Sequence, residues 1–178
     1  TVFPNIGPSG TGDFALRVTG TGTITAGGKL VVNNIQPRWT GNYTAAGIGW
    51  IVFDVRNLNS VPLTLRVGID GPAVGTTGGR WITPGLTVPA QSGWKTLFFP
   101  FTAQSLVAGD LSATNVATTL SNVAVIRIMH APTAAWTGEP IAGQMDLNDI
   151  EALPEPRLGT ALVAGIASLV ALGRTRRR

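Results

Sequence analysis

The stretch PLTLRVGID, residues 62–70, alternates apolar and polar side chains with a period of two. Its aliphatic members fall on one side of an extended chain: Leu63, Leu65, Val67 and Ile69. A period of two is typical of a β-strand that buries one face. The sequence therefore predicts a strand here whose aliphatic face packs into a hydrophobic core.

Six further strands are predicted on either side of this stretch. FALRVTG (14–20) alternates in the same way, whereas GWIVFDV (49–55) is nearly all apolar, which favours a central strand covered on both faces, with Trp50 in the core. The others are GKLVVNN (28–34), WKTLFFPF (94–101), VAVIRIMH (123–130) and QMDLNDIEAL (144–153). Pro100 should mark an edge strand or a bulge. Many short strands with glycine-rich turns predict an all-β sandwich over residues 1–153.

Charge is unevenly distributed along the 178 residues. The net charge is +4, from 13 basic and 9 acidic residues, but residues 1–156 hold only eight of the basic ones and all nine acidic ones, a net of −1. We therefore expect no basic face for nucleic acid. Cysteine is absent, so neither disulfides nor thiol redox chemistry is expected. The other basic residues lie near the end: Arg157, Arg174, Arg176, Arg177 and Arg178.

The run between these arginines, residues 158–173, carries no charge. As a helix it would be about 24 Å long, slightly short of the roughly 30 Å hydrocarbon core of a bilayer, and flanking arginines can extend it by snorkelling. We expect a transmembrane helix here; a buried core helix is the alternative. Because basic flanks stay in the cytoplasm, residues 174–178 should form a cytoplasmic tail and residues 1–153 a periplasmic domain. Small residues at four-residue spacing would allow a partner helix to approach.

A short linker, residues 154–157, separates the two predicted parts. Pro154, Glu155 and Pro156 form an extended segment that cannot continue a helix. Together with the apolar run and the terminal arginines, this segment resembles the tripartite PEP-CTERM sorting signal of Gram-negative bacteria. The resemblance implies export, retention by the tail and cleavage near the PEP segment by exosortase, a membrane-embedded protease. Since Thr1 is not preceded by a leader, we expect a mature form whose signal peptide has been removed.

A second resemblance covers residues 13–153. Five segments follow one another in an order similar to that of jelly-roll modules, namely laminin domain IV and galactose-binding-like carbohydrate modules. These segments are FDVRN, LTLRVGIDG, GRWITPGLTVPAQSGWKTLFFPF, LSNVAVIRI and MDLNDIEAL. The resemblance implies a jelly-roll domain that binds sugars or proteins, or acts as a spacer, without catalysis.

Residues suited to catalysis or metal binding are few. His130 is the only histidine, so a histidine-based metal cluster is excluded, and a hydrogen-bonded residue at a strand end is expected. Asp146, Asp149 and Glu151 could serve glycoside hydrolysis, but strand alternation puts Asp146 on the face opposite the other two, and a solvated strand face is the simpler interpretation. Jelly rolls often join their first and last strands with a structural calcium, for which Asp13 and Asp146 are candidate ligands.

Aromatic residues in glycine- and threonine-rich loops are the remaining candidates for contact with a ligand or partner. Aromatic faces stack on sugar rings and also fill protein interfaces. QPRWTGNYT (36–44) and GGRWIT (78–83) each pair tryptophan with arginine, a combination enriched at binding hot spots. Packing beneath the loops is the alternative. The candidate contact residues are Trp39, Tyr43, Arg80, Trp81 and Trp136.

Three functions are compatible with these features. The first is a non-enzymatic structural or interaction protein, a periplasmic sandwich held in the inner membrane by its tail, in contact with lipid and with membrane-protein partners of a larger complex. The alternative is an exosortase-processed surface or extracellular matrix protein whose module binds polysaccharide. A glycosidase-like enzyme is the third. No cofactor is expected apart from the structural calcium.

Overall fold

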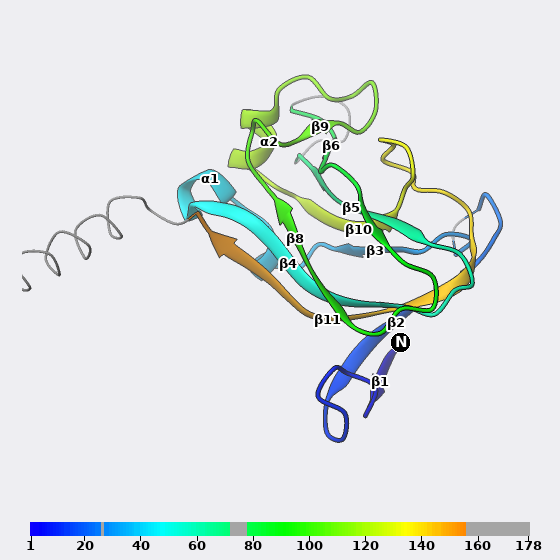
Figure 1. Ribbon diagram of the computed structural model, residues 1–178. Coiled ribbons are helices and arrows are strands. Elements are labelled where there is room, and N and C mark those ends of the chain that lie inside the picture. Colours follow the sequence, from blue (N-terminus) through cyan, green and yellow to red (C-terminus); the bar gives the residue numbers. More distant parts are fainter. Residues whose placement is uncertain (26, 72–77, 156–178) are drawn as a thin grey trace, which may run out of the picture.

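The computed structural model describes residues 1–25, 27–71 and 78–155. The predicted transmembrane helix and basic tail, together with Pro156 and Arg157, lie outside these residues. Among the helices of the described residues, none has the length and hydropathy needed to cross a membrane. The described chain confirms the all-β jelly-roll sandwich: two antiparallel sheets pack face to face (Figure 1).

The first sheet has the strand order β1-β2-β11-β4-β8. Its strands are β1 (Val2–Pro4), β2 (Phe14–Thr21), β11 (Ala142–Pro154), β4 (Ile48–Asn57) and β8 (Lys95–Pro100). The second sheet has the order β3-β10-β5-β6-β9, and β7 pairs with β5 beside this path. Its strands are β3 (Val31–Asn34), β10 (Val125–His130), β5 (Leu63–Asp70), β6 (Trp81–Ile82), β9 (Val107–Ala108) and β7 (Leu86–Val88).

Three short helical segments complete the described fold. They are η1 (Pro37–Trp39), α1 (Tyr43–Ala46) and α2 (Val116–Ser121). The two α-helices lie together at one end of the sandwich (Figure 1). Each begins at an asparagine whose side chain accepts a backbone N–H of the first turn: Asn42 caps α1 and Asn115 caps α2. Such caps stabilise helices too short to persist on their own.

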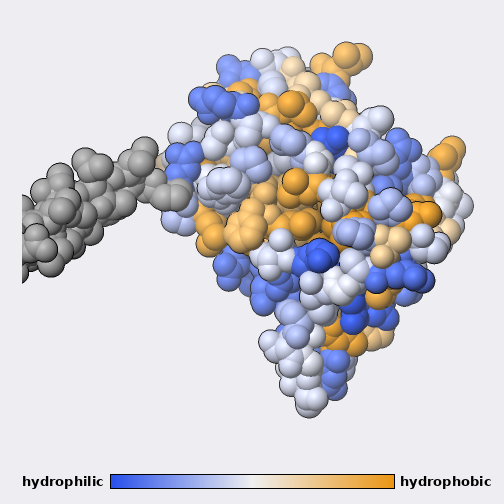
Figure 2. All heavy atoms as spheres, viewed as in Figure 1, coloured by the Kyte–Doolittle hydropathy of each residue, from blue (hydrophilic) through white to orange (hydrophobic). Residues whose placement is uncertain are grey.

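The main core lies between the two sheets and is lined by the residues that the alternation of β5 predicted. Leu63, Leu65, Val67 and Ile69 are fully buried. Opposite them, the first sheet contributes Phe53 and Phe99, whose rings stack with centroids 5.3 Å apart. Pro100 ends β8, which is an edge strand, as predicted. On the outer surface, exposed apolar side chains are scattered among polar ones over the face viewed in Figure 2.

The prediction that β4 is covered on both faces holds only in part. Ile51, Phe53 and Val55 are fully buried on the core side, but on the other side only Val52 is buried, at 7% exposure, and Trp50 and Asp54 are half-buried. Trp50 is therefore not a core residue. An apolar run predicts burial on both faces only when another layer covers the outer side, and here that side of β4 is covered only in part.

The simple alternation predicted for the last strand is also interrupted. A β-bulge between Asn148 and Glu151 inserts an extra residue against β4, and Asp149 adopts a left-handed backbone conformation with φ of 44°. Beyond the bulge, Pro154 pairs with Ile48, and the Glu155 N–H donates to the Gly47 carbonyl over 2.9 Å. The described half of the predicted linker is thus bonded to the sandwich.

Candidate functional site

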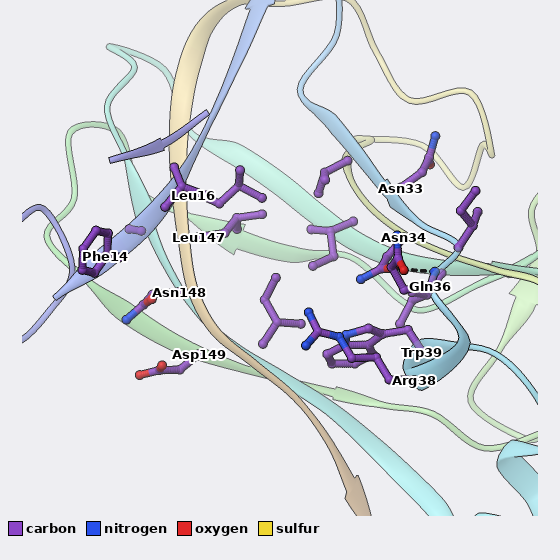
Figure 3. Close-up of a pocket in the computed structure, with 17 residues that line it drawn as sticks. Phe14, Leu16, Asn33, Asn34, Gln36, Arg38, Trp39, Leu147, Asn148 and Asp149 are labelled. Atoms are coloured by element: carbon purple, nitrogen blue, oxygen red, sulfur yellow. Dashed lines mark hydrogen bonds between the residues drawn. The ribbon is translucent and has the colours of Figure 1, made fainter. Parts of the chain in front are cut away.

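A groove opens along one side of the sandwich, where the two sheets diverge. β2 pairs with β11 only as far as Leu16 opposite Leu147, while the start of β2 pairs with β1 instead. The edge of β11 beyond Leu147 therefore faces β3 and η1 across an open space of about 560 Å³, a volume within the range of ligand sites. Figure 3 shows this groove with Trp39 and Arg38 on one side and Phe14, Asn148 and Asp149 on the other.

The floor of the groove is apolar and comes from both sheets. The first sheet supplies Leu16 and Leu147, and the second supplies Ile126 and Ile128. The floor is continuous with the main core, because Leu147, Ile126 and Ile128 are only 1 to 4% exposed and belong to that core. At the rim, Phe14 is 56% exposed and offers a second aromatic ring.

Trp39 lies at the end of η1 and is held there by the segment that follows. The Tyr43 hydroxyl donates to the Trp39 carbonyl over 2.8 Å, and the Tyr43 ring packs against Phe101 in the core. Burial raises the pKa of Tyr43 to about 12, so the hydroxyl stays protonated and remains a donor. Trp39 is half-buried, with one part of its ring against the core and the rest at the groove.

Polar side chains surround the apolar floor. Asn34 accepts the Gln36 N–H over 2.9 Å, which shapes the turn into η1. Arg38, on η1, is exposed and lines the groove. On the opposite side, Asn148 donates weakly to Asp13 over 3.4 Å, and Asp149 is exposed at the bulge. An apolar surface with a few polar groups at its rim is the usual arrangement of a site for a small organic ligand.

The sandwich is similar to solved family 11 carbohydrate-binding modules. The solution structure of CtCBM11 superposes with a TM-score of 0.55 at 17% identity, over 88% of this chain and 83% of that chain. The Clostridium thermocellum family 11 module, in complex with a β-1,3-1,4-mixed-linked tetrasaccharide, gives 0.51 at 21% identity, over 86% and 82%. The likeness is one of fold. No protein-family model and no curated protein matches the sequence.

The five predicted contact residues fall in two separate places. Trp39 lines the groove, and Tyr43 supports it from the core, 5% exposed. The other three lie away from the groove: Trp81 is on β6 and packs against the main core, Arg80 directly precedes it, and Trp136 lies between β10 and β11. Tyr43 and Trp136 thus present no free ring face, and packing beneath loops describes them better than ligand contact.

Trp136 anchors a smaller hydrophobic cluster on the outer face of the second sheet, with Ile82, Met129 and Ala131. Two guanidinium groups lie over its ring, with Arg127 Cζ 4.2 Å and Arg80 Cζ 5.4 Å from the centroid. Arg80 also bonds Asp70 and Asp110 at 3.0 and 2.9 Å. Trp81, the neighbouring residue, donates its indole N–H to the Gly78 carbonyl. These contacts indicate that Arg80, Trp81 and Trp136 stabilise the surrounding loops.

Asp146, the proposed calcium ligand, is fully buried between two arginines on the outer face of the first sheet. Arg17 Nε donates to Oδ1 over 2.7 Å, and Arg56 Nη2 donates to Oδ2 over 2.6 Å. Asp13, the other proposed ligand, accepts the Ser9 N–H over 2.9 Å. Within the described residues no three acidic or metal-ligating side chains gather. Calcium binding here stays a prediction, and it would have to displace both guanidinium groups.

His130 lies at the end of β10, and its Nδ1 accepts the Thr64 N–H over 3.1 Å. Burial lowers its pKa below the usual value, so the neutral ring is favoured. The expectation of a hydrogen-bonded histidine at a strand end is confirmed.

Several groove residues were missed from the sequence: Phe14, Asn34, Gln36, Arg38 and Asn148. Arg38 had a visible signal, because it precedes Trp39 in the stretch QPRWTGNYT. The others carry no local signature, since their role depends on which strands the fold brings together.

Proposed function

We propose that residues 1–155 form a non-catalytic module that binds polysaccharide in the groove between β11 and η1. The observation that carries the proposal is a groove with an apolar floor, two aromatic rings and several amide groups, on a fold similar to that of carbohydrate-binding modules. A sugar ring has apolar C–H faces and a polar hydroxyl rim. The groove matches both, because aromatic rings can stack on the faces while amides bond the hydroxyls.

Trp39 would be the main stacking platform. Its ring packs in part against the core and its backbone carbonyl accepts the Tyr43 hydroxyl, so little ordering entropy remains to be lost when a sugar binds. Phe14 offers a second ring across the groove, and Gln36 and Asn148 lie within reach of hydroxyl groups. This arrangement suits an extended chain lying along the groove.

The comparisons favour this polysaccharide-binding alternative over a subunit of a membrane complex, because the similar structures are carbohydrate-binding modules. A glycosidase-like catalytic function has less support than polysaccharide binding. Asp146 is bonded to two arginines. The prediction that Glu151 faces away from Asp146 is wrong, because the bulge pairs Glu151 with Val52, on the same face of β4 as Arg56, the partner of Asp146. Asp149 and Glu151 are left as the exposed carboxylates of the last strand.

The setting in the cell is also a proposal and rests on the tail. If residues 154–178 act as the PEP-CTERM signal that they resemble, exosortase would release the module to the cell surface or extracellular matrix. Without cleavage it would stay on the periplasmic side of the inner membrane, with lipid as its partner. Mass spectrometry of the native protein distinguishes a C-terminus near Pro156 from one at Arg178.

A binding experiment tests the function directly. Isothermal titration against a panel of soluble polysaccharides should find at least one ligand, and Trp39→Ala should weaken its affinity at least tenfold, about 1.4 kcal/mol. Trp94→Ala is the matched control, since Trp94 is half-buried near β8, the edge strand opposite the groove. Equal losses in both variants, or binding unchanged by Trp39→Ala, would place any sugar site elsewhere.

A further inference from the structure

We infer that the groove selects polysaccharides that carry carboxylate groups, an inference that rests on the proposed binding function. It comes from Arg38, the one cation among the described residues that line the groove. Arg38 is exposed on η1 directly beside the Trp39 platform. In Figure 3 its guanidinium group points toward the middle of the groove.

The other arginines of the described chain are all engaged within the fold. Arg17 and Arg56 bond Asp146, and Arg80 bonds Asp70 and Asp110. Arg66 donates to the carbonyls of Ala131, Thr83 and Pro132, and Arg127 donates to Asn33 and the Trp136 carbonyl. Among the arginines of residues 1–25, 27–71 and 78–155, Arg38 is the one that makes neither an ion pair nor a side-chain hydrogen bond. Its donors are therefore available to a ligand.

A guanidinium group is well suited to a carboxylate. Its planar fork of N–H donors matches the two oxygens, and the paired hydrogen bonds are stronger than those to a neutral hydroxyl. A uronic acid carries its carboxylate on the sugar ring. One residue could therefore stack on Trp39 while its carboxylate reaches Arg38, the adjacent residue of η1.

Two acidic groups near the groove bear on this selectivity. Asp149 lies at the opposite rim, with its carboxylate directed away from Arg38 in Figure 3. Glu151 lines an adjoining hollow together with Arg38 and Trp39, but its carboxylate is not within 4.0 Å of the guanidinium nitrogens. Glu151 would therefore oppose an acidic ligand without neutralising Arg38, and removing its charge should strengthen binding.

The test compares acidic and neutral chains on the full-length protein. The probes are polygalacturonate, alginate, carboxyl-reduced polygalacturonate and mixed-linkage β-glucan, titrated at low salt. We expect at least one of the two uronans to bind about tenfold more tightly than the uncharged probes, and Arg38→Gln to remove that difference. Glu151→Gln should strengthen uronan binding about twofold or more. Lys95→Gln, the same charge change on β8, should leave it unchanged.

The outcomes separate the inference from the function on which it rests. If the wild-type protein binds the neutral probes as tightly as the uronans, and Trp39→Ala abolishes that binding, polysaccharide binding stands and acidic selectivity is overturned. If uronan affinity falls equally in Arg38→Gln and Lys95→Gln, the effect is one of net charge and the inference also fails. If the folded protein binds no probe, both proposals are wrong for these chains.

Discussion

Gly68 lies on β5 directly beneath the ring of Trp136, and a single β-carbon would not fit there. A Cβ added at this position would lie 2.8 Å from Cζ3 of Trp136 and 3.1 Å from Ile82. Gly68→Ala should therefore lower the free energy of unfolding by about 1–3 kcal/mol through overpacking, measured by urea denaturation. Gly93→Ala is the control, because a Cβ added there would meet no atom within 4 Å, and its stability should be unchanged or slightly higher.

His130 should make stability depend on pH near neutrality. Burial lowers its pKa in the folded protein below the usual 6.5, so as pH falls below that value the unfolded chain takes up a proton that the folded protein does not. Stability should therefore fall progressively as pH drops from about 7 toward the lower folded pKa. Thermal melts across this range should show a smaller decline in His130→Gln. If Tm declined equally with pH in the wild type and in His130→Gln, the pH dependence would come from other groups.

At the scale of elements, Asp146 joins three strands of the first sheet. It lies directly opposite Arg17 on β2 and opposite Arg56 on β4, so the three side chains form a ladder across the strands. Aromatic rings flank it, with Phe3 5.2 Å from Arg17 Cζ and Trp94 5.2 Å from Arg56 Cζ. A slip of one residue in either pairing would break this ladder, which therefore specifies register.

Asp146→Ala should lower stability by about 3 kcal/mol, the low end for a broken buried ion pair, because both arginines keep some contact with water. Adding Arg17→Met and Arg56→Met to an Asp146→Leu variant should recover most of that loss. Urea denaturation of the single and triple variants measures both effects. No loss in the single variant would mean that the ladder contributes little.

The Asp146 carboxylate should give stability a second pH dependence, at lower pH than that of His130. Burial alone would raise the pKa of Asp146, but the hydrogen bonds and charges of Arg17 and Arg56 outweigh it and hold the pKa below the usual value. Because the folded pKa is lowered, the stabilisation is complete above the ordinary carboxyl value near 3.9 and is lost as pH falls through the folded value. Acid denaturation of Asp146→Asn should lack this component, visible as a shallower decline below pH 4.

Strand prediction succeeded where periodicity was strong. All seven predicted strands occur, and the best-patterned one, β5, has its four aliphatic residues fully buried. The strands that were missed, β1, β6, β7 and β9, have only two or three residues each, too few to show a period. β1, β6 and β7 form beside longer strands that offer unpaired backbone groups, β2 and β5, and β9 pairs in turn with β6. The bulge at Asp149 could not be seen either, because it depends on pairing with β4.

At the scale of the whole molecule, the candidate site was only partly predictable. Its lining comes from five separate parts of the chain: Val2 and residues 14–16, 32–39, 126–128 and 147–150. The sequence indicated that an aromatic loop around Trp39 could contact a ligand. It could not show that β2 and β11 are neighbours, because that pairing joins strands more than 120 residues apart.

Metal removal tests the remaining prediction about the sandwich as a whole. The oxygens of Asp146 already accept hydrogen bonds from two arginines, which join the first and last long strands without a metal. We expect EDTA and added calcium to leave the Tm unchanged. A calcium-dependent rise in Tm that disappears in Asp13→Asn would instead support the calcium site.

β11 is the last strand of the described fold, yet it lies in the middle of the first sheet, between β2 and β4. While the chain is being synthesised, β2 and β4 therefore have no common partner until this final segment leaves the ribosome. Folding that waits for such distant contacts is slow. A premature stop before the last strand would leave the first sheet as two unjoined pairs of strands, β1-β2 and β4-β8.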